Sequence, residues 1–78
     1  MKAGKHVFQV IVEQDEAGFF IAECPALRAC YTQGRSYEDV LNKIRDVITL
    51  CLMDLKRRKK QIPASPEIIA VKRIEVVA

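Results

Sequence analysis

The sequence predicts an α+β fold in the order β-β-β-α-β, an antiparallel meander with one long helix packed on one face of the sheet. Three observations predict it. β-Branched and aromatic residues are grouped in three short runs near the N-terminus, with Gly and Pro between them. A long stretch with apolar residues at steps of three and four follows, which indicates an amphipathic helix. Beyond two prolines, a further β-branched run predicts a last strand.

The first strand is predicted over residues 6–14. Its apolar side chains alternate between two faces, with Phe8, Val10 and Val12 on one and Val7 and Ile11 on the other. An antiparallel sheet with one solvated face shows a cleaner alternation of apolar and polar residues than this. We therefore expect the face away from the helix to be covered as well, by another copy of the chain or by a partner.

A turn and two shorter strands follow. Asp15 to Gly18 predicts the turn, because Gly18 is free to take a positive φ, and residues 19–23 then form a hairpin with the first strand. This second strand is apolar on both faces. Residues 29–33 predict a short third strand that ends at Gly34.

The helix is predicted over residues 36–60. Ser36 is suited to the N-cap, and Asp39 is placed to reach back to it in the manner of a capping box. Pro63 and Pro66 prevent continuation, and residues 67–78 predict the last strand. The predicted core stripe of the helix comprises Val40, Leu41, Ile44, Val47, Ile48, Cys51, Leu52 and Leu55.

The net charge of +3 is unevenly distributed along the 78 residues. Residues 1–34 carry three basic and four acidic side chains, whereas residues 35–60 carry eight basic and four acidic ones. The excess therefore lies on the predicted helix, and the chain lacks the overall positive field that is typical of nucleic-acid-binding proteins. We expect one domain over residues 1–78, with no signal peptide and no membrane span.

Three cysteines, an odd number, indicate a reducing compartment, so we expect a cytoplasmic protein. Cys24 and Cys30 lie six residues apart and Cys51 lies on the helix stripe, whereas zinc sites usually show closer pairs. We expect Cys30 and Cys51 in the core and Cys24 partly exposed.

No set of residues predicts an enzyme. Asp15 and Glu16 lie at the predicted turn with two further carboxylates nearby, and such groups can bind a hard cation or act as acid and base. The simpler interpretation is a polar turn between solvated strands, because no nucleophile or base accompanies them. His6 is the only histidine, and no phosphate-binding glycine loop is present. We expect no catalytic residue, no cofactor and no metal.

The most concentrated charge is a run of five cations at the end of the predicted helix: Lys56, Arg57, Arg58, Lys59 and Lys60. Such a run can contact phosphates. It also complements the helix dipole as a solvated helix end, which is the simpler interpretation. No aromatic residue lies beside it to stack on bases.

One combination of residues resembles the HicB-like antitoxin family, in its small single-domain, UPF0150-type form. The matching residues are Val10, Val12, Asp15, Glu16, Gly18, Phe19, Pro25, Leu27, Cys30, Gln33, Gly34, Ser36, Glu38 and Asp39. The resemblance implies a partial ribonuclease H-like fold of the same element order, without nuclease activity. It also implies an antitoxin that binds a small HicA-like RNA-cleaving toxin. The chain departs from the family pattern at Ala29, where Gly is common, and we expect no C-terminal DNA-binding segment.

The predicted function is therefore association with other proteins. The predicted partner or oligomer interface comprises Val7, Ile11, Phe19 and Ile21, with Asp15 and Glu16 at its rim. We expect a homo-oligomer that masks a HicA-like toxin. Two alternatives remain open: an oligomer that binds nucleic acid through the basic helix end, and a structural homo-oligomer with no toxin partner.

Overall fold

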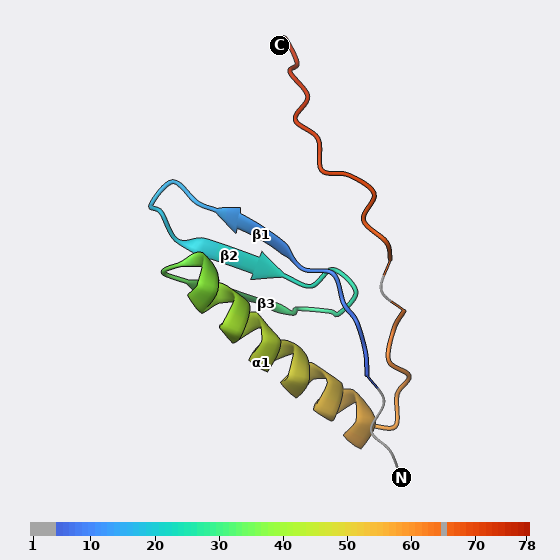
Figure 1. The fold of residues 1–78 in the computed structure, drawn as a ribbon. Helices are drawn as coiled ribbons and strands as arrows, with labels where there is room; N and C mark the ends of the chain where they lie inside the picture. Colours follow the sequence, from blue (N-terminus) through green and yellow to red (C-terminus); the bar gives the residue numbers. More distant parts are fainter. Residues whose placement is uncertain (1–4, 65) are drawn as a thin grey trace.

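The computed structural model describes residues 5–64 and 66–78 and has a single three-stranded sheet with one long helix (Figure 1). The elements are β1 (Ile11–Gln14), β2 (Phe20–Glu23), β3 (Tyr31–Gly34) and α1 (Tyr37–Arg57). The strands are antiparallel and lie in the order β1-β2-β3. The predicted α+β class, with a meander followed by a helix, is confirmed.

The strand register assigns alternate residues to the two faces of the sheet. Val12 lies opposite Ala22, and Ala22 lies opposite Thr32, so these residues share one face. Ala22 is fully buried, and α1 packs against β2 and β3 on this side. The other side, which we call the outer face, carries Ile11, Glu13, Ile21, Glu23, Tyr31 and Gln33.

The core lies between the sheet and α1. Among the described residues, the apolar side chains buried in it are Ala22, Cys24, Leu27, Cys30, Val40 and Ile44. Phe8, Val10 and Val12 pack against this cluster, as predicted from their alternation, but β1 begins only at Ile11, so the first strand is shorter than the predicted residues 6–14. The helix stripe is confirmed except at Leu41, which lies outside this cluster, since Val47, Ile48, Cys51, Leu52 and Leu55 complete the cluster from α1.

Side chains at the N-terminus of α1 satisfy its free backbone groups. Ser36 is the N-cap, and its Oγ accepts a hydrogen bond from the Asp39 N–H at 3.0 Å. The Asp39 carboxylate accepts from the Arg35 N–H at 3.1 Å and not from Ser36, so the reciprocal half of the predicted capping box is shifted by one residue. This hydrogen bond and a second one from Lys43 lower the pKa of Asp39.

The helix ends at Arg57, three residues before the predicted end. Arg58 is the C-cap, and Lys59 adopts a left-handed conformation with φ of 57°. The Lys60 N–H donates to the Leu55 carbonyl at 2.9 Å, and the Lys59 N–H donates to the Lys56 carbonyl at 3.0 Å. This is the Schellman arrangement, with lysine at the position where glycine is usual.

Gly34 allows β3 to approach the start of α1 closely. A Cβ atom at this position would lie 2.8 Å from the Val40 backbone nitrogen and 2.9 Å from the Val40 Cα. Any larger side chain would therefore separate the strand from the helix. Residues 29–33 were predicted as the third strand, but Ala29 has φ of 54° within a turn and pairing begins at Tyr31.

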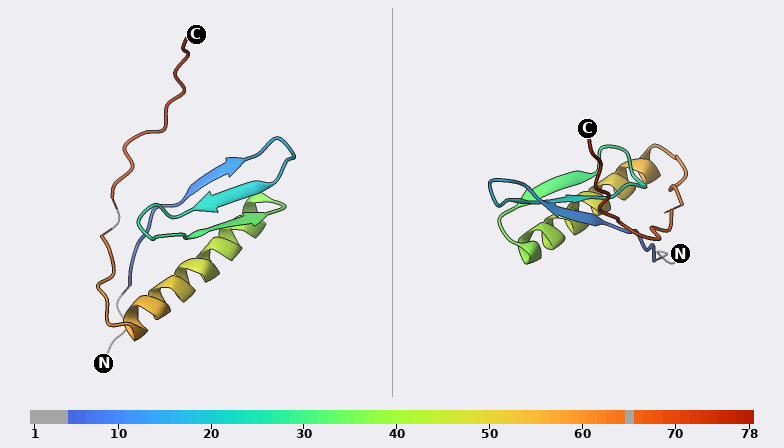
Figure 2. Two further views of the ribbon diagram at one scale, coloured as in Figure 1. Left: turned by 180° about the vertical axis from the view of Figure 1, so that it is seen from behind. Right: turned by 90° about the horizontal axis from the view of Figure 1, so that it is seen from above.

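The predicted last strand over residues 67–78 is wrong for the single chain. The structure has no strand among the described residues 66–78, and the segment runs away from the sheet (Figures 1 and 2). Its side chains are exposed, apart from a half-buried Ile68. A β-branched composition favours extended backbone, but a strand also needs a partner edge, which this segment does not reach along most of its length.

Candidate protein-interaction surface

The outer face of the sheet is the side opposite α1. Figure 2 shows the helix on one side of the sheet only. The Asp15 N–H donates to the Phe19 carbonyl at 2.9 Å, so Phe19 continues the register and belongs to the outer face together with Ile11 and Ile21. The fold thus assigns three of the four predicted apolar interface residues to one surface. Val7 precedes β1 and is 86% exposed.

Carboxylates and isoleucines alternate across this surface. Ile11 lies opposite Glu23, and Ile21 lies between Glu13 and Gln33. Each isoleucine therefore has a polar neighbour on the next strand, and both glutamates are exposed. Such a surface remains hydrated in a single chain, yet it offers both apolar area and negative charge to a partner.

The hairpin tip carries the two predicted rim residues. Asp15 Oδ1 accepts from the Phe19 N–H at 2.9 Å, and the Gly18 N–H donates to the Asp15 carbonyl at 3.0 Å. Gly18 has φ of 92°, as the predicted turn requires. Asp15 therefore shapes the turn, whereas Glu16 is simply exposed within it.

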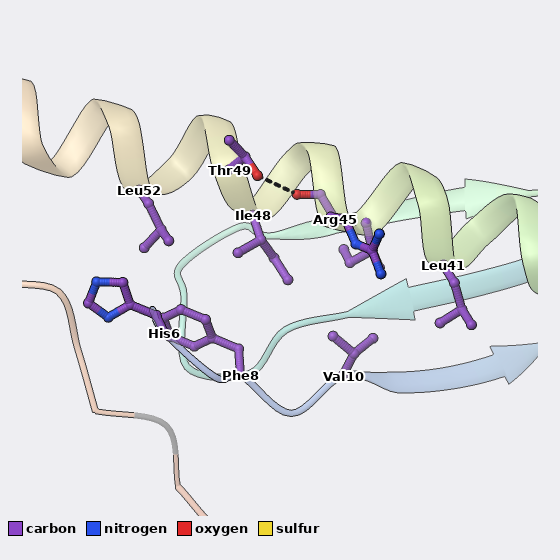
Figure 3. Close-up of a pocket in the computed structure, with 9 residues that line it drawn as sticks. His6, Phe8, Val10, Leu41, Arg45, Ile48, Thr49 and Leu52 are labelled. Atoms are coloured by element: carbon purple, nitrogen blue, oxygen red, sulfur yellow. Dashed lines mark hydrogen bonds between the residues drawn. The ribbon is translucent and has the colours of Figure 1, made fainter. Parts of the chain in front are cut away.

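A groove separates the chain before β1 from α1. It encloses about 450 Å³, and its walls are mostly apolar (Figure 3). The lining residues are His6, Phe8, Val10, Leu41, Ile44, Arg45, Ile48, Thr49 and Leu52. The groove exists because α1 lies over β2 and β3, which leaves the helix-facing side of β1 incompletely covered. The sequence did not reveal it, because it arises from the lateral offset of the helix.

The three cysteines lie beside one another in the core. The Cys24 N–H donates to the Cys30 carbonyl at 2.9 Å, which makes these residues cross-strand neighbours one step beyond the β2–β3 ladder. Burial raises the pKa of the Cys30 thiol to about 12, and the neighbouring Cys51 and Cys24 thiols contribute to the shift. Cys24 is fully buried, so its predicted partial exposure is wrong. Within the described part of the chain, no three His, Cys, Asp or Glu side chains, these cysteines included, are arranged so that they could hold a metal ion.

The five basic residues that could contact phosphates, Lys56 to Lys60, lie at the C-terminal end of α1. Asp54 accepts from Arg57 Nη2 at 2.8 Å and from Arg58 Nη1 at 3.3 Å, and these hydrogen bonds lower the pKa of Asp54. Lys56, Lys59 and Lys60 are exposed beside this group. Figure 1 shows that this end lies far from the β1–β2 hairpin tip, so the basic and acidic features occupy opposite ends of the molecule.

No helix among the described residues is long and apolar enough to cross a membrane.

Comparison with known proteins identifies the family. No family model matches the chain. The UPF0150 protein ssr1258 of Synechocystis is 36% identical over 72 residues, which cover 92% of this chain and 97% of that protein. The chain belongs to the UPF0150 family. A UPF0150 protein of Archaeoglobus fulgidus is 30% identical over 69 residues, 88% of this chain and 93% of the relative. A third UPF0150 protein, from Helicobacter pylori, is 42% identical over 50 residues, 64% of this chain and 68% of the relative.

Proposed function

We propose that this UPF0150 protein is a binding module of the HicB-like antitoxin type, which masks a small HicA-like RNA-cleaving toxin through the outer face of its sheet. The proposal rests on one observation: α1 covers only one face of the sheet. Ile11, Phe19 and Ile21 lie on the face that α1 does not reach. The resemblance described above supplies the class of partner.

The chemistry of the outer face suits such a partner. An RNA-binding surface carries Lys and Arg side chains that contact phosphates. Glu13 and Glu23 on the outer face, with Glu16 at the hairpin tip, would meet these cations in place of RNA. The isoleucines between them supply apolar contact.

Masking a toxin requires a sufficient buried interface area and no catalytic step. A stable complex buries about 800 Å² on each partner. The antitoxin then acts by occupying the surface that RNA would otherwise reach, so the proposed role requires no catalytic residue and no cofactor.

Substitution at the centre of the outer face tests the proposal. Ile21→Arg places a cation between Glu13 and Gln33, where it opposes a basic partner and removes apolar contact. Leu50→Arg is the matched control, because Leu50 is 64% exposed on α1 and lies outside the outer face. We expect Ile21→Arg to weaken binding to a purified HicA-like toxin at least about 10-fold, equivalent to about 1.4 kcal/mol.

The readouts are calorimetric affinity and the protection of a substrate RNA from cleavage by the toxin. Circular dichroism checks that both variants fold. The proposal is wrong if Ile21→Arg still inhibits the toxin fully, or if only Leu50→Arg loses inhibition.

A further inference from the structure

The C-terminal segment, residues 66–78, has the composition of a strand but forms none in the single chain. It exposes five large apolar side chains to at least 78%: Ile69, Val71, Ile74, Val76 and Val77. So many exposed β-branched residues in one extended stretch are typical of a segment that pairs with another sheet.

The sheet has an unpaired edge that such a segment could complete. β1 is a terminal strand of the sheet, so every second backbone N–H and C=O group along it points away from β2. The C-terminal segment already touches the approach to this edge, where the Ile68 N–H donates to the Gln9 side-chain carbonyl. Beyond Ile68 the segment leaves the domain (Figures 1 and 2).

The groove beside β1 also fits an added strand. A strand alongside β1 would direct alternate side chains toward α1, over the groove that Leu41 and Ile48 help to line (Figure 3). One alternating set of the segment is mostly apolar, with Ile68, Ile74 and Val76 as its large members. These side chains match the apolar walls.

The other alternating set would extend the outer face. It contains Arg73 between Val71 and Glu75, and the adjacent strand β1 carries Glu13 on that face. Opposite charges on neighbouring strands stabilise pairing. Both faces of the segment are thus compatible with a place beside β1.

We propose that residues 67–78 form a donor strand that pairs with the β1 edge of a second copy of the chain, with reciprocal exchange in a two-fold dimer. A single chain has one unpaired β1 edge and one unpaired strand-forming segment, and its own segment turns away from its own edge. In an exchange between two copies, each C-terminal segment pairs with the β1 edge of the other copy, so neither edge and neither segment remains unpaired. This inference goes beyond the proposed function and does not depend on the toxin.

Proline substitutions in the full-length chain test the exchange. Proline cannot donate to a β ladder, and at exposed positions of the segment it leaves the domain core untouched. We expect a mass of two chains for the unmodified protein and of one chain for Ile74→Pro combined with Val76→Pro, by size exclusion with light scattering. Ala64→Pro is the matched control in the preceding linker, and it keeps the mass of two chains.

Two results on mass would overturn the proposal: a single-chain mass for the unmodified protein, or a two-chain mass for the double proline variant. Ile21→Arg leaves the two-chain mass unchanged, because Ile21 lies on β2 and not at the exchanged edge. Failure of partner binding and failure of the exchange are therefore separate results.

Isotope-filtered NMR on a mixture of ¹⁵N-labelled and ¹³C-labelled chains distinguishes exchange from pairing within one chain. We expect contacts between β1 amides and the methyl groups of Val71 and Ile74 across the two labels. If these contacts occur only within one label, the strand belongs to its own chain and the exchange does not occur.

Discussion

At the scale of single residues, Cys30 shows how the fold changes the chemistry of a side chain. Cys30 is 1% exposed, and Cys24 and Cys51 lie beside it. Thiols react as thiolates, so a thiol whose pKa is raised in this way stays inert near neutral pH. The cluster therefore acts as a small apolar unit that joins β2, β3 and α1.

Because the pKa of Cys30 is raised, the free energy of unfolding depends on pH in the alkaline range. Below pH 9 the thiol is neutral in both the folded and the unfolded chain, whereas between pH 9 and about 12 only the unfolded thiol ionises. Unfolding then releases a proton, so the free energy of unfolding falls as pH rises, by up to about 1.4 kcal/mol per pH unit. We expect this fall in urea denaturation curves between pH 8 and 11.

Cys30→Ala supplies the comparison, because it differs from the unmodified protein only in the absence of this thiol. The variant is less stable at neutral pH, and its deficit shrinks above pH 9. Parallel pH profiles for the two proteins would show that the Cys30 thiol does not carry the effect.

Local signals in the sequence predicted part of this structure. The N-cap at Ser36 and the helix stripe depend on residues within a few positions of one another, and both are confirmed. The approach of Cys24, Cys30 and Cys51 depends on contacts between three elements, which spacing along the chain does not encode. The alternation in β1 predicted the faces of the sheet but not the groove.

At the scale of elements, the end of α1 contains a strained residue. Lys59 has φ of 57°, a conformation that costs a residue with a Cβ atom roughly 1 kcal/mol relative to glycine. We expect Lys59→Gly to stabilise the protein by about 0.5–1 kcal/mol, because it relieves this strain and keeps the Schellman hydrogen bonds. The midpoint of urea unfolding measures the effect.

Lys60→Gly is the matched control, since it removes the same charge one position later, outside the left-handed conformation. It should leave stability unchanged or lower it slightly. Equal stabilisation by both substitutions would assign the effect to charge repulsion within the basic helix end.

The C-terminal segment is the element for which sequence and structure differ most. Its β-branched residues correctly predict extended backbone, but pairing depends on where an edge lies in space. The exchange proposed above would restore the predicted β-β-β-α-β order within a dimer. The prediction would then be wrong only about which chain supplies the last strand.

At the scale of the whole molecule, charge and shape distinguish the surfaces that the two proposals use. The outer face carries isoleucines and glutamates, the β1 edge is free to pair, and the cations are concentrated at the far end of α1. Since Arg57 and Arg58 share Asp54, part of this positive charge is compensated locally. A protein partner on the outer face therefore fits the molecule better than nucleic acid at the helix end.

The most direct test is an NMR titration of the ¹⁵N-labelled chain with a purified HicA-like toxin. We expect the largest shifts at the amides of β1, β2 and β3, centred on Ile21, with little change at Leu50 and at Lys56 to Lys60. Shifts confined to the exposed side of α1, or to its basic end, would contradict the claim that the outer face of the sheet is the binding surface.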